Sequence, residues 1–200
     1  MTTPAKKSPL TLTQVRLLSG ILKQRGNQRD LALFLVAFDA MLRASDLLAL
    51  RLGDLATSEG KIRKRFEVVQ QKTGKPVTVA LTKSSEEALA SWLRWSGKID
   101  YAGVDPEAFI FTRLNGDLEA PISRRYYSRL LKNWASFAGI DPEALGTHSM
   151  RRTKAALIYS KTKNLRAVQL MLGQTTLAAT QVYLGIEAGE AADLAASLEV

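Results

Sequence analysis

An almost unbroken apolar run, residues 31–38, constrains the fold of this chain more than any other feature. It lies within a predicted helix, residues 29–42. Because apolar side chains cover nearly the whole circumference of that helix, it is predicted to be buried on most sides. Extended to residue 42, the run contains Asp39 and is too short to span a bilayer. With 46% hydrophobic residues, the chain of 200 residues can bury such a helix in a real core.

The middle of the chain changes from helical to strand-like patterning. Apolar residues recur within segment 61–70, residues 72–75 form a predicted turn, and Val77, Val79 and Leu81 alternate as a returning strand. This pattern predicts one β-hairpin with a lysine close to its tip. A short strand is also expected at residues 109–111, followed by a turn at 115–117.

The remaining elements are predicted to be helices with recognisable start signals. Thr11 and Gln14 predict a capping box, and Ser45 and Ser123 are predicted N-caps. The predicted helices span residues 11–26, 29–42, 46–51, 84–96, 124–138, 148–159, 164–172, 177–185 and 187–198.

Together these elements predict a mainly α fold with a small antiparallel β-sheet (α+β). Residues 1–10 are expected to form a flexible basic tail. Residues 11–200 are expected to form a single domain, because no internal repeat or low-complexity linker divides them.

Charge and composition narrow the possible functions. The 28 Lys and Arg residues outnumber the 19 Asp and Glu residues, and the net charge of +9 favours a polyanionic partner such as nucleic acid. The chain has no cysteine, which excludes disulfides, thiolate zinc sites and cysteine nucleophiles. Its single histidine and the absence of HExxH or EF-hand patterns argue against a metal site. The polar N-terminus lacks the apolar segment of a secretory signal, so we expect a cytoplasmic protein.

Polar residues at scattered positions suit chemistry on a phosphodiester: Arg43, Lys72, a His148-x-x-Arg151 pair and Tyr183. A planar guanidinium can bind two phosphate oxygens at once and keeps its charge. The spacing of His148 and Arg151 predicts that they share one helical face. A phenol near two arginines is favoured as a phenolate, which makes Tyr183 a candidate nucleophile. Taken singly, each of these residues is more often structural, so their order along the chain carries the hypothesis.

That order resembles the active site of the tyrosine recombinases, or phage integrases. Residues 42–50, together with Met41 before them, are similar to the family motif Gly-x-Arg-x-x-Glu-x-x-x-Leu, with Met41 in place of glycine and Asp46 in place of glutamate. Residues 172–183 are similar to Leu-Gly-His-x-x-x-x-x-Thr-x-x-Tyr, with Gln174 in place of histidine. The resemblance extends over about residues 11–186.

The resemblance implies a role for each of these residues. Tyr183 would attack the scissile phosphate to form a 3′-phosphotyrosine bond, while Arg43 and Arg151 hold the phosphate oxygens. Lys72 would protonate the leaving 5′ oxygen, and His148 would help to move the proton of the tyrosine. At the histidine position, Gln174 can donate a hydrogen bond but cannot act as an acid or base, so reduced activity is expected. No metal, ATP or other cofactor is implied. The candidate DNA-contacting residues are Lys64, Arg65, Lys75, Arg124, Arg125 and Arg152, with Arg152 expected off the site itself.

The resemblance also implies partners and a domain organisation. Double-stranded DNA would be the substrate, and the protein would be associated with the nucleoid. The chain corresponds to the catalytic domain of the family, without the N-terminal domain that clamps the other side of the DNA. The predicted helix at 187–198 either packs on its own domain or docks onto a neighbour in a ring of four on DNA.

Other functions remain open from the sequence. Gln174 and the missing clamp domain are compatible with a non-catalytic DNA-binding regulator or a decayed relative. A type IB topoisomerase would share the chemistry, and an RNA- or ribosome-associated protein would share the charge.

Overall fold

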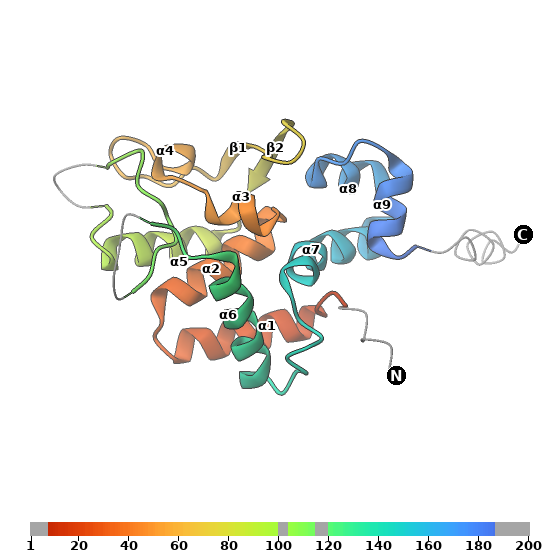
Figure 1. Ribbon diagram of the computed structural model, residues 1–200, viewed down its shortest axis with the longest axis horizontal. Coiled ribbons are helices and arrows are strands. Elements are labelled where there is room, and N and C mark those ends of the chain that lie inside the picture. Colours follow the sequence, from red (N-terminus) through yellow and green to blue (C-terminus); the bar gives the residue numbers. More distant parts are fainter. Residues whose placement is uncertain (1–7, 100–103, 115–119, 187–200) are drawn as a thin grey trace, which may run out of the picture.

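Helix α2 (Gln28–Ala40) lies in the core, as its apolar sequence predicts. In the computed structural model, which describes residues 8–99, 104–114 and 120–186, Leu33 and Phe34 have no exposed surface. Helices α1 (Leu12–Gln24), α5 (Lys83–Trp95) and α7 (Thr147–Thr162) pack against α2 (Figure 1). The mainly helical fold with a small sheet is therefore confirmed. The other helices are α3 (Ala44–Leu48), α4 (Leu52–Leu55), α6 (Arg124–Phe137), α8 (Leu165–Leu172) and α9 (Leu177–Leu184).

The predicted hairpin is the two-stranded sheet of the described chain. Strand β1 (Arg65–Val69) pairs antiparallel with β2 (Pro76–Ala80), in a register that places Phe66 opposite Val79. Phe66, Val77 and Val79 are buried while their strand neighbours are exposed, so the alternation in the sequence matches one buried face. The hairpin lies beside α8, and its tip carries Lys72 (Figure 1).

Two predicted caps are confirmed and one is wrong. Thr11 forms the capping box with Gln14, and the Ser123 side chain accepts the N–H of Tyr126. The Ser45 cap is wrong, because α3 already begins at Ala44 and the Ser45 hydroxyl instead donates to the Asp46 carboxylate at 3.4 Å.

The predicted third helix is also shorter than expected. It ends at Leu48, and the separate turn α4 follows after Arg51. The carboxylate of Asp54 accepts the Arg51 N–H at 2.8 Å and satisfies one of the donors at the start of α4. The chain therefore bends between residues 48 and 52.

The strand predicted at residues 109–111 is wrong. Phe109 and Thr112 take part only in isolated bridges, to Arg51 and Pro121 respectively. The Ile110 N–H instead donates to the Leu50 carbonyl, and the Ile110 carbonyl accepts from the Trp92 indole at 2.8 Å. The apolar segment is thus buried as a connecting loop, which explains its composition without a third strand.

A buried ionic network fixes α7 against α2. The Asp39 carboxylate accepts from Lys154 at 2.6 Å, from the Thr82 hydroxyl at 2.8 Å and from the Ser85 hydroxyl at 2.5 Å. Because these partners come from α7 and from the start of α5, one polar residue of α2 joins three helices. A buried carboxylate is tolerated when it is paired and hydrogen-bonded in this way.

Some predictions fall outside the described residues. These are the turn at 115–117, the helix at 187–198 and most of the tail at 1–10. Among the helices that the structure describes, none is long and apolar enough to cross a membrane.

Candidate active site

Arg43 stands between the end of α2 and the start of α3. Its backbone occupies the N-cap position of α3, and its side chain is half-buried. One guanidinium nitrogen, Nη1, donates to the side-chain oxygen of Gln70 at 2.6 Å. The side chain predicted to bind phosphate is therefore held by Gln70, which directly follows the first strand of the hairpin.

Arg151, on α7, is only 4% exposed. Its Nε donates to the Met41 carbonyl at 2.8 Å, and its Nη2 donates to the Leu172 carbonyl at 2.8 Å. Burial lowers the pKa of this guanidinium, while the neighbouring Tyr183 opposes that shift. The two carbonyls come from the ends of α2 and α8, so Arg151 joins segments that are far apart in the sequence.

Tyr183, on α9, lies against this arginine. The guanidinium carbon of Arg151 is 5.6 Å from the centre of the Tyr183 ring, and that of Arg152 is 5.9 Å away. The Tyr183 hydroxyl is buried, and Arg151 interacts with it, although no group in the described part of the chain meets strict hydrogen-bond geometry with it. Burial raises the pKa of this phenol, whereas Arg151, Arg152 and Arg43 act in the opposite direction. The phenol is thus surrounded by the charges that would stabilise its anion.

Arg152 does not lie off the site as predicted. Its Nη1 donates to the Tyr183 carbonyl in a long hydrogen bond of 3.4 Å, and its guanidinium faces the ring. It is half-buried between α7 and α9. Any contact of Arg152 with DNA remains a prediction.

The hairpin tip brings Lys72 next to Arg43. The Asp46 carboxylate accepts the backbone N–H of Gln71 at 3.2 Å, which ties the tip to α3. Lys72 itself is exposed and lines an open groove of about 680 Å³ together with Arg43 and Arg124. This groove therefore combines cations from three separate elements.

Comparison with known proteins identifies the chain. Residues 9–189 match the phage integrase family. The chain belongs to this family. Relatives include tyrosine recombinase XerD of Rickettsia conorii, 28% identical over 149 residues, which are 73% of this chain and 48% of XerD. Tyrosine recombinase XerC of Thermodesulfovibrio yellowstonii is 30% identical over 162 residues, 80% of this chain and 51% of XerC. The chain thus spans about half the length of these relatives.

Solved integrase-family structures share the fold. XerA recombinase superposes with a TM-score of 0.74 at 19% identity, covering 98% of this chain and 66% of XerA. XerH, in a pre-cleavage complex with its difH substrate, superposes with a TM-score of 0.73 at 19% identity, covering 97% of this chain and 55% of XerH.

The remaining residues of the integrase motifs lie on neighbouring turns. His148 is exposed in the first turn of α7, whereas Arg151 is buried one turn later. Gln174 follows Gly173 at the end of α8, and its side-chain oxygen is buried with no hydrogen bond to any described group. The structure thus brings Arg43, Arg151 and Tyr183 together, while His148 lies one turn before Arg151 on α7 and Gln174 follows α8 directly after Gly173.

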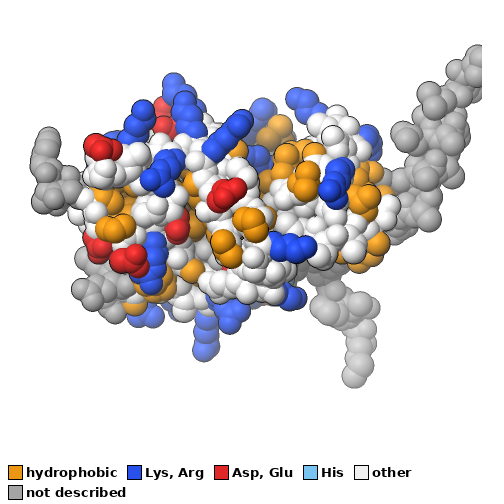
Figure 2. All heavy atoms as spheres, turned by 90° about the horizontal axis from the view of Figure 1, so that it is seen from above, with side chains coloured by type: hydrophobic (Ala, Val, Ile, Leu, Met, Phe, Trp, Pro, Cys, Tyr) orange, Lys and Arg blue, Asp and Glu red, His pale blue; other side chains and the backbone are white. Residues whose placement is uncertain are grey.

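Most candidate DNA-contacting side chains lie on the hairpin and on the first turn of α6. Figure 2 shows the hairpin face, on which many blue Lys and Arg side chains project outward. A positively charged surface of this kind attracts phosphate. The exposed candidates are Lys64, Arg65, Lys75, Arg124 and Arg125.

Sequence reasoning missed Gln70, which is completely buried. A signal was present, because the alternation of β1 places Gln70 on the same face as Phe66 and Val68. A polar residue on the apolar face of a strand has to find a partner inside the protein.

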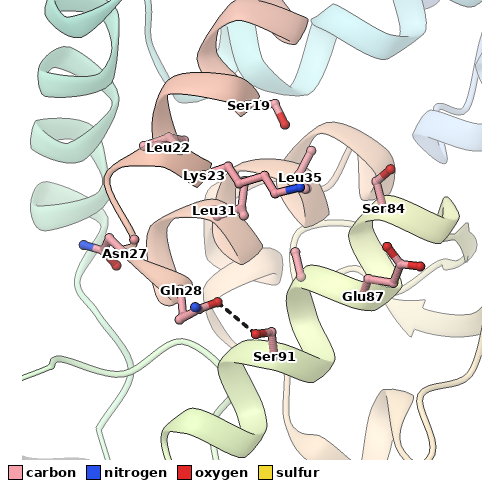
Figure 3. Close-up of a pocket in the computed structure, with 12 residues that line it drawn as sticks. Ser19, Leu22, Lys23, Asn27, Gln28, Leu31, Leu35, Ser84, Glu87 and Ser91 are labelled. Atoms are coloured by element: carbon pink, nitrogen blue, oxygen red, sulfur yellow. Dashed lines mark hydrogen bonds between the residues drawn. The ribbon is translucent and has the colours of Figure 1, made fainter.

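A second cavity lies away from these residues. It has a volume of about 470 Å³ and lies between α1, α2 and α5 (Figure 3). Leu22 and Leu31 line it together with Lys23, and a hydrogen bond of 2.9 Å joins Ser91 to Gln28 at one end. The described residues around it include none of the predicted site residues.

Met41 shows why the integrase motif has glycine before its first arginine. Its backbone is left-handed, with φ 50° and ψ 27°, a conformation that an L-residue adopts at a cost. Its side chain compensates by packing with Ala155, Val168 and Leu172. Met41 therefore has a strained backbone conformation but gains a buried side chain.

Substitution of Met41 should separate these two effects. Met41→Ala and Met41→Gly both lose the buried side chain, so each is expected to be less stable by about 2 kcal/mol or more. The glycine variant should be more stable than the alanine variant by about 1 kcal/mol, because only glycine is unstrained here. Urea unfolding measures both differences. An alanine variant as stable as the glycine variant would show that the left-handed backbone carries no strain.

Proposed function

We propose that this chain is the catalytic part of a site-specific DNA recombinase that cuts and rejoins DNA through a 3′-phosphotyrosine bond. The observation that carries the proposal is the convergence of Arg43, Arg151 and Tyr183. Gln70 and the Leu172 carbonyl link the two guanidinium groups, and that of Arg151 lies 5.6 Å from the centre of the Tyr183 ring. Membership in the phage integrase family supports it, because relatives of this chain are tyrosine recombinases.

In the proposed reaction, the Tyr183 oxygen attacks the scissile phosphorus. A bond forms between phosphorus and the phenol oxygen, and the bond to the 5′ oxygen breaks. Arg43 and Arg151 stabilise the charge that develops on the phosphate oxygens. The exposed Lys72 gives a proton to the leaving 5′ oxygen, and His148 receives the proton of the phenol.

Gln174 completes the proposed oxyanion contacts. Its amide NH₂ can donate to a phosphate oxygen, but it cannot exchange a proton. Because the phosphotyrosine bond conserves the energy of the original ester, strand rejoining is the reversal of these steps. The proposal therefore includes no ATP, metal or other cofactor.

A nicked suicide substrate tests the proposed function. The probe is a pool of duplexes of randomised sequence, each nicked so that the cut fragment diffuses away after attack. We expect a covalent protein–DNA adduct that survives detergent and disappears on proteolysis. If the pool binds but no adduct forms, the chain is a non-catalytic DNA-binding relative. Relaxation of supercoiled plasmid irrespective of sequence would indicate a topoisomerase.

We further propose that the protein associates with itself on DNA. Hydrophobic side chains are exposed over α8 and α9, at the right-hand end of the face in Figure 2. Exposed apolar patches often mark interaction surfaces, and this one adjoins the element that carries Tyr183. A tetramer on DNA, with the segment 187–198 docked onto a neighbour, is the arrangement we propose. The exposed residues are Leu170, Met171, Leu177 and Val182.

The domain organisation and location follow from the same proposal. Residues 11–200 would form one catalytic domain, preceded by a basic tail at 1–10. A recombinase acts where chromosomal or mobile-element DNA lies, so we place the protein in the cytoplasm at the nucleoid.

DNA binding is expected to weaken steeply with salt. If about 6–10 phosphates are neutralised, affinity should fall by roughly 10³–10⁵ between 50 and 200 mM salt. Fluorescence anisotropy with a labelled duplex measures the slope. Lys75→Ala should reduce the slope by about one unit, whereas Lys23→Ala, at the cavity between α1, α2 and α5, should leave it unchanged. A flat salt response contradicts a phosphate-binding surface.

A further inference from the structure

Gln70 is a buried amide at the base of the hairpin tip. It has 0% exposed surface and directly follows strand β1. The turn that carries Lys72 is built on its backbone, because the Gln70 carbonyl accepts the N–H of Thr73 at 3.2 Å and of Gly74 at 2.8 Å. The residue therefore belongs to the element that presents one proposed catalytic cation.

The Gln70 side chain also connects the two proposed phosphate-binding arginines. Its Oε1 accepts from Arg43 Nη1 at 2.6 Å, and its Nε2 donates to the Leu172 carbonyl at 3.0 Å. The same carbonyl accepts from Arg151 Nη2 at 2.8 Å. A continuous path of hydrogen bonds thus runs from one guanidinium to the other through a single amide and a single carbonyl.

The path is closed on its other side by the backbone. Arg151 Nε donates to the carbonyl of Met41, which lies two residues before Arg43 in the chain. Both ends of the arrangement are therefore anchored: Arg151 cannot turn without breaking buried hydrogen bonds, and Arg43 cannot turn without breaking a part-buried one. Unpaired buried polar groups are costly, so this arrangement resists rotation.

Close packing encloses the amide. Gly173 has φ +61°, and a Cβ atom there would lie 2.5 Å from Val77 Cγ1 and 3.0 Å from Gln70 Nε2. The glycine of the integrase motif thus lets the end of α8 approach the hairpin closely enough for Gln70 to reach the Leu172 carbonyl.

We propose that Gln70 is a positioning residue for DNA cleavage, which sets Arg43 relative to Arg151 so that both guanidinium groups address one phosphate. The inference rests on the proposed recombinase function. It adds a residue that touches no reacting atom and acts through Arg43.

A neutral amide suits this task better than the alternatives. Its oxygen orients Arg43 without neutralising the charge that the phosphate needs, and its NH₂ satisfies the Leu172 carbonyl. A glutamate would still accept from Arg43, but it would pair with the cation and lose the donor to Leu172. A methionine would fill a similar volume but would bind neither the Arg43 guanidinium nor the Leu172 carbonyl.

The experiment compares single-turnover cleavage of the nicked duplexes by Gln70→Met, Gln70→Glu and the unsubstituted chain. Both variants are expected to cleave about 10²-fold more slowly, the effect of a small misplacement of a catalytic group. Their affinity for the same DNA should change by less than about threefold, since the exposed cations are intact. Gln24→Ala is the matched control, because this exposed glutamine at the end of α1 does not line the groove with Arg43 and Lys72. It should cleave at the unsubstituted rate.

Two further variants distinguish positioning from general stability. Val79→Ala removes a buried side chain from the same hairpin and should lower the melting temperature while keeping cleavage near the unsubstituted rate. In an Arg43→Lys background, Gln70→Met should cause little further loss, because the group through which it acts is gone.

The outcomes separate the inference from the proposed function. Three results would each overturn the positioning role alone. They are unchanged cleavage by Gln70→Met, a loss of cleavage in Val79→Ala equal to that in Gln70→Met, and the same fold loss of cleavage on adding Gln70→Met to the Arg43→Lys background. If Gln70→Met does not fold, Gln70→Glu decides, and cleavage at the unsubstituted rate then overturns the role. If the unsubstituted chain forms no adduct, the recombinase proposal and this inference fail together.

Discussion

Tyr183→Phe is expected to abolish the covalent protein–DNA adduct without destabilising the fold. The substitution removes the only atom that could bond to phosphorus in the proposed reaction and keeps the ring against Arg151 and Arg152. Because the buried hydroxyl interacts with Arg151 only outside strict hydrogen-bond geometry, its loss should change the free energy of unfolding by no more than about 1 kcal/mol. Such a combination, loss of chemistry with no loss of stability, is typical of a residue held for function.

Denaturing gels with the nicked duplex pool measure the adduct, and thermal unfolding measures stability. Tyr159→Phe is the matched control, because this half-buried tyrosine lies on α7 and packs in the same small cluster. It should form the adduct normally. An adduct formed by Tyr183→Phe would assign the nucleophile to another residue, and a large loss of stability would show that the hydroxyl has a structural role.

Arg151→Ala is expected to reduce cleavage by about 10²–10³-fold while DNA binding changes little. The guanidinium would act mainly on the charge that develops in the transition state, whereas the exposed cations provide most of the affinity. The same substitution should also lower the free energy of unfolding by about 1–3 kcal/mol. The reason is that the Met41 carbonyl loses its side-chain donor, while the Leu172 carbonyl keeps Gln70.

Single-turnover cleavage and urea unfolding separate the two effects of Arg151. Arg151→Lys keeps a positive charge but not the planar fork that reaches two carbonyls at once, so it should recover part of the stability and little of the cleavage. Arg129→Ala is the control, since this exposed arginine on α6 only faces the Tyr126 ring at 5.0 Å. Normal cleavage by Arg151→Ala would contradict the proposed mechanism.

Some local predictions succeeded because short-range patterns decide them. The apolar circumference of α2, the alternation of β1 and β2, and the caps at Thr11 and Ser123 each depend on a few neighbouring residues. The motif around Tyr183 predicted the family, whereas the roles of its residues remain predictions until the variants are measured.

Other predictions failed where distant contacts compete with local preference. Residues 109–111 have strand-like composition, yet the backbone of Ile110 forms its hydrogen bonds with the Leu50 carbonyl and with the Trp92 side chain. Ser45 has the chemistry of a cap, but the N-cap of α3 lies two residues earlier, at Arg43. Arg152 was expected off the site and instead lies against Tyr183.

By itself, the order of residues along this chain determined its family, its mainly helical class and the positions where charged groups occur, because periodicity and motif spacing are local properties. Only the tertiary structure decided how those groups are held. Arg151 is buried against two carbonyls, Gln70 joins it to Arg43, and Asp39 fixes α7 on α2. Each of these contacts joins segments that meet only after the core has packed, since a hydrogen bond depends on position in space and not on separation in sequence.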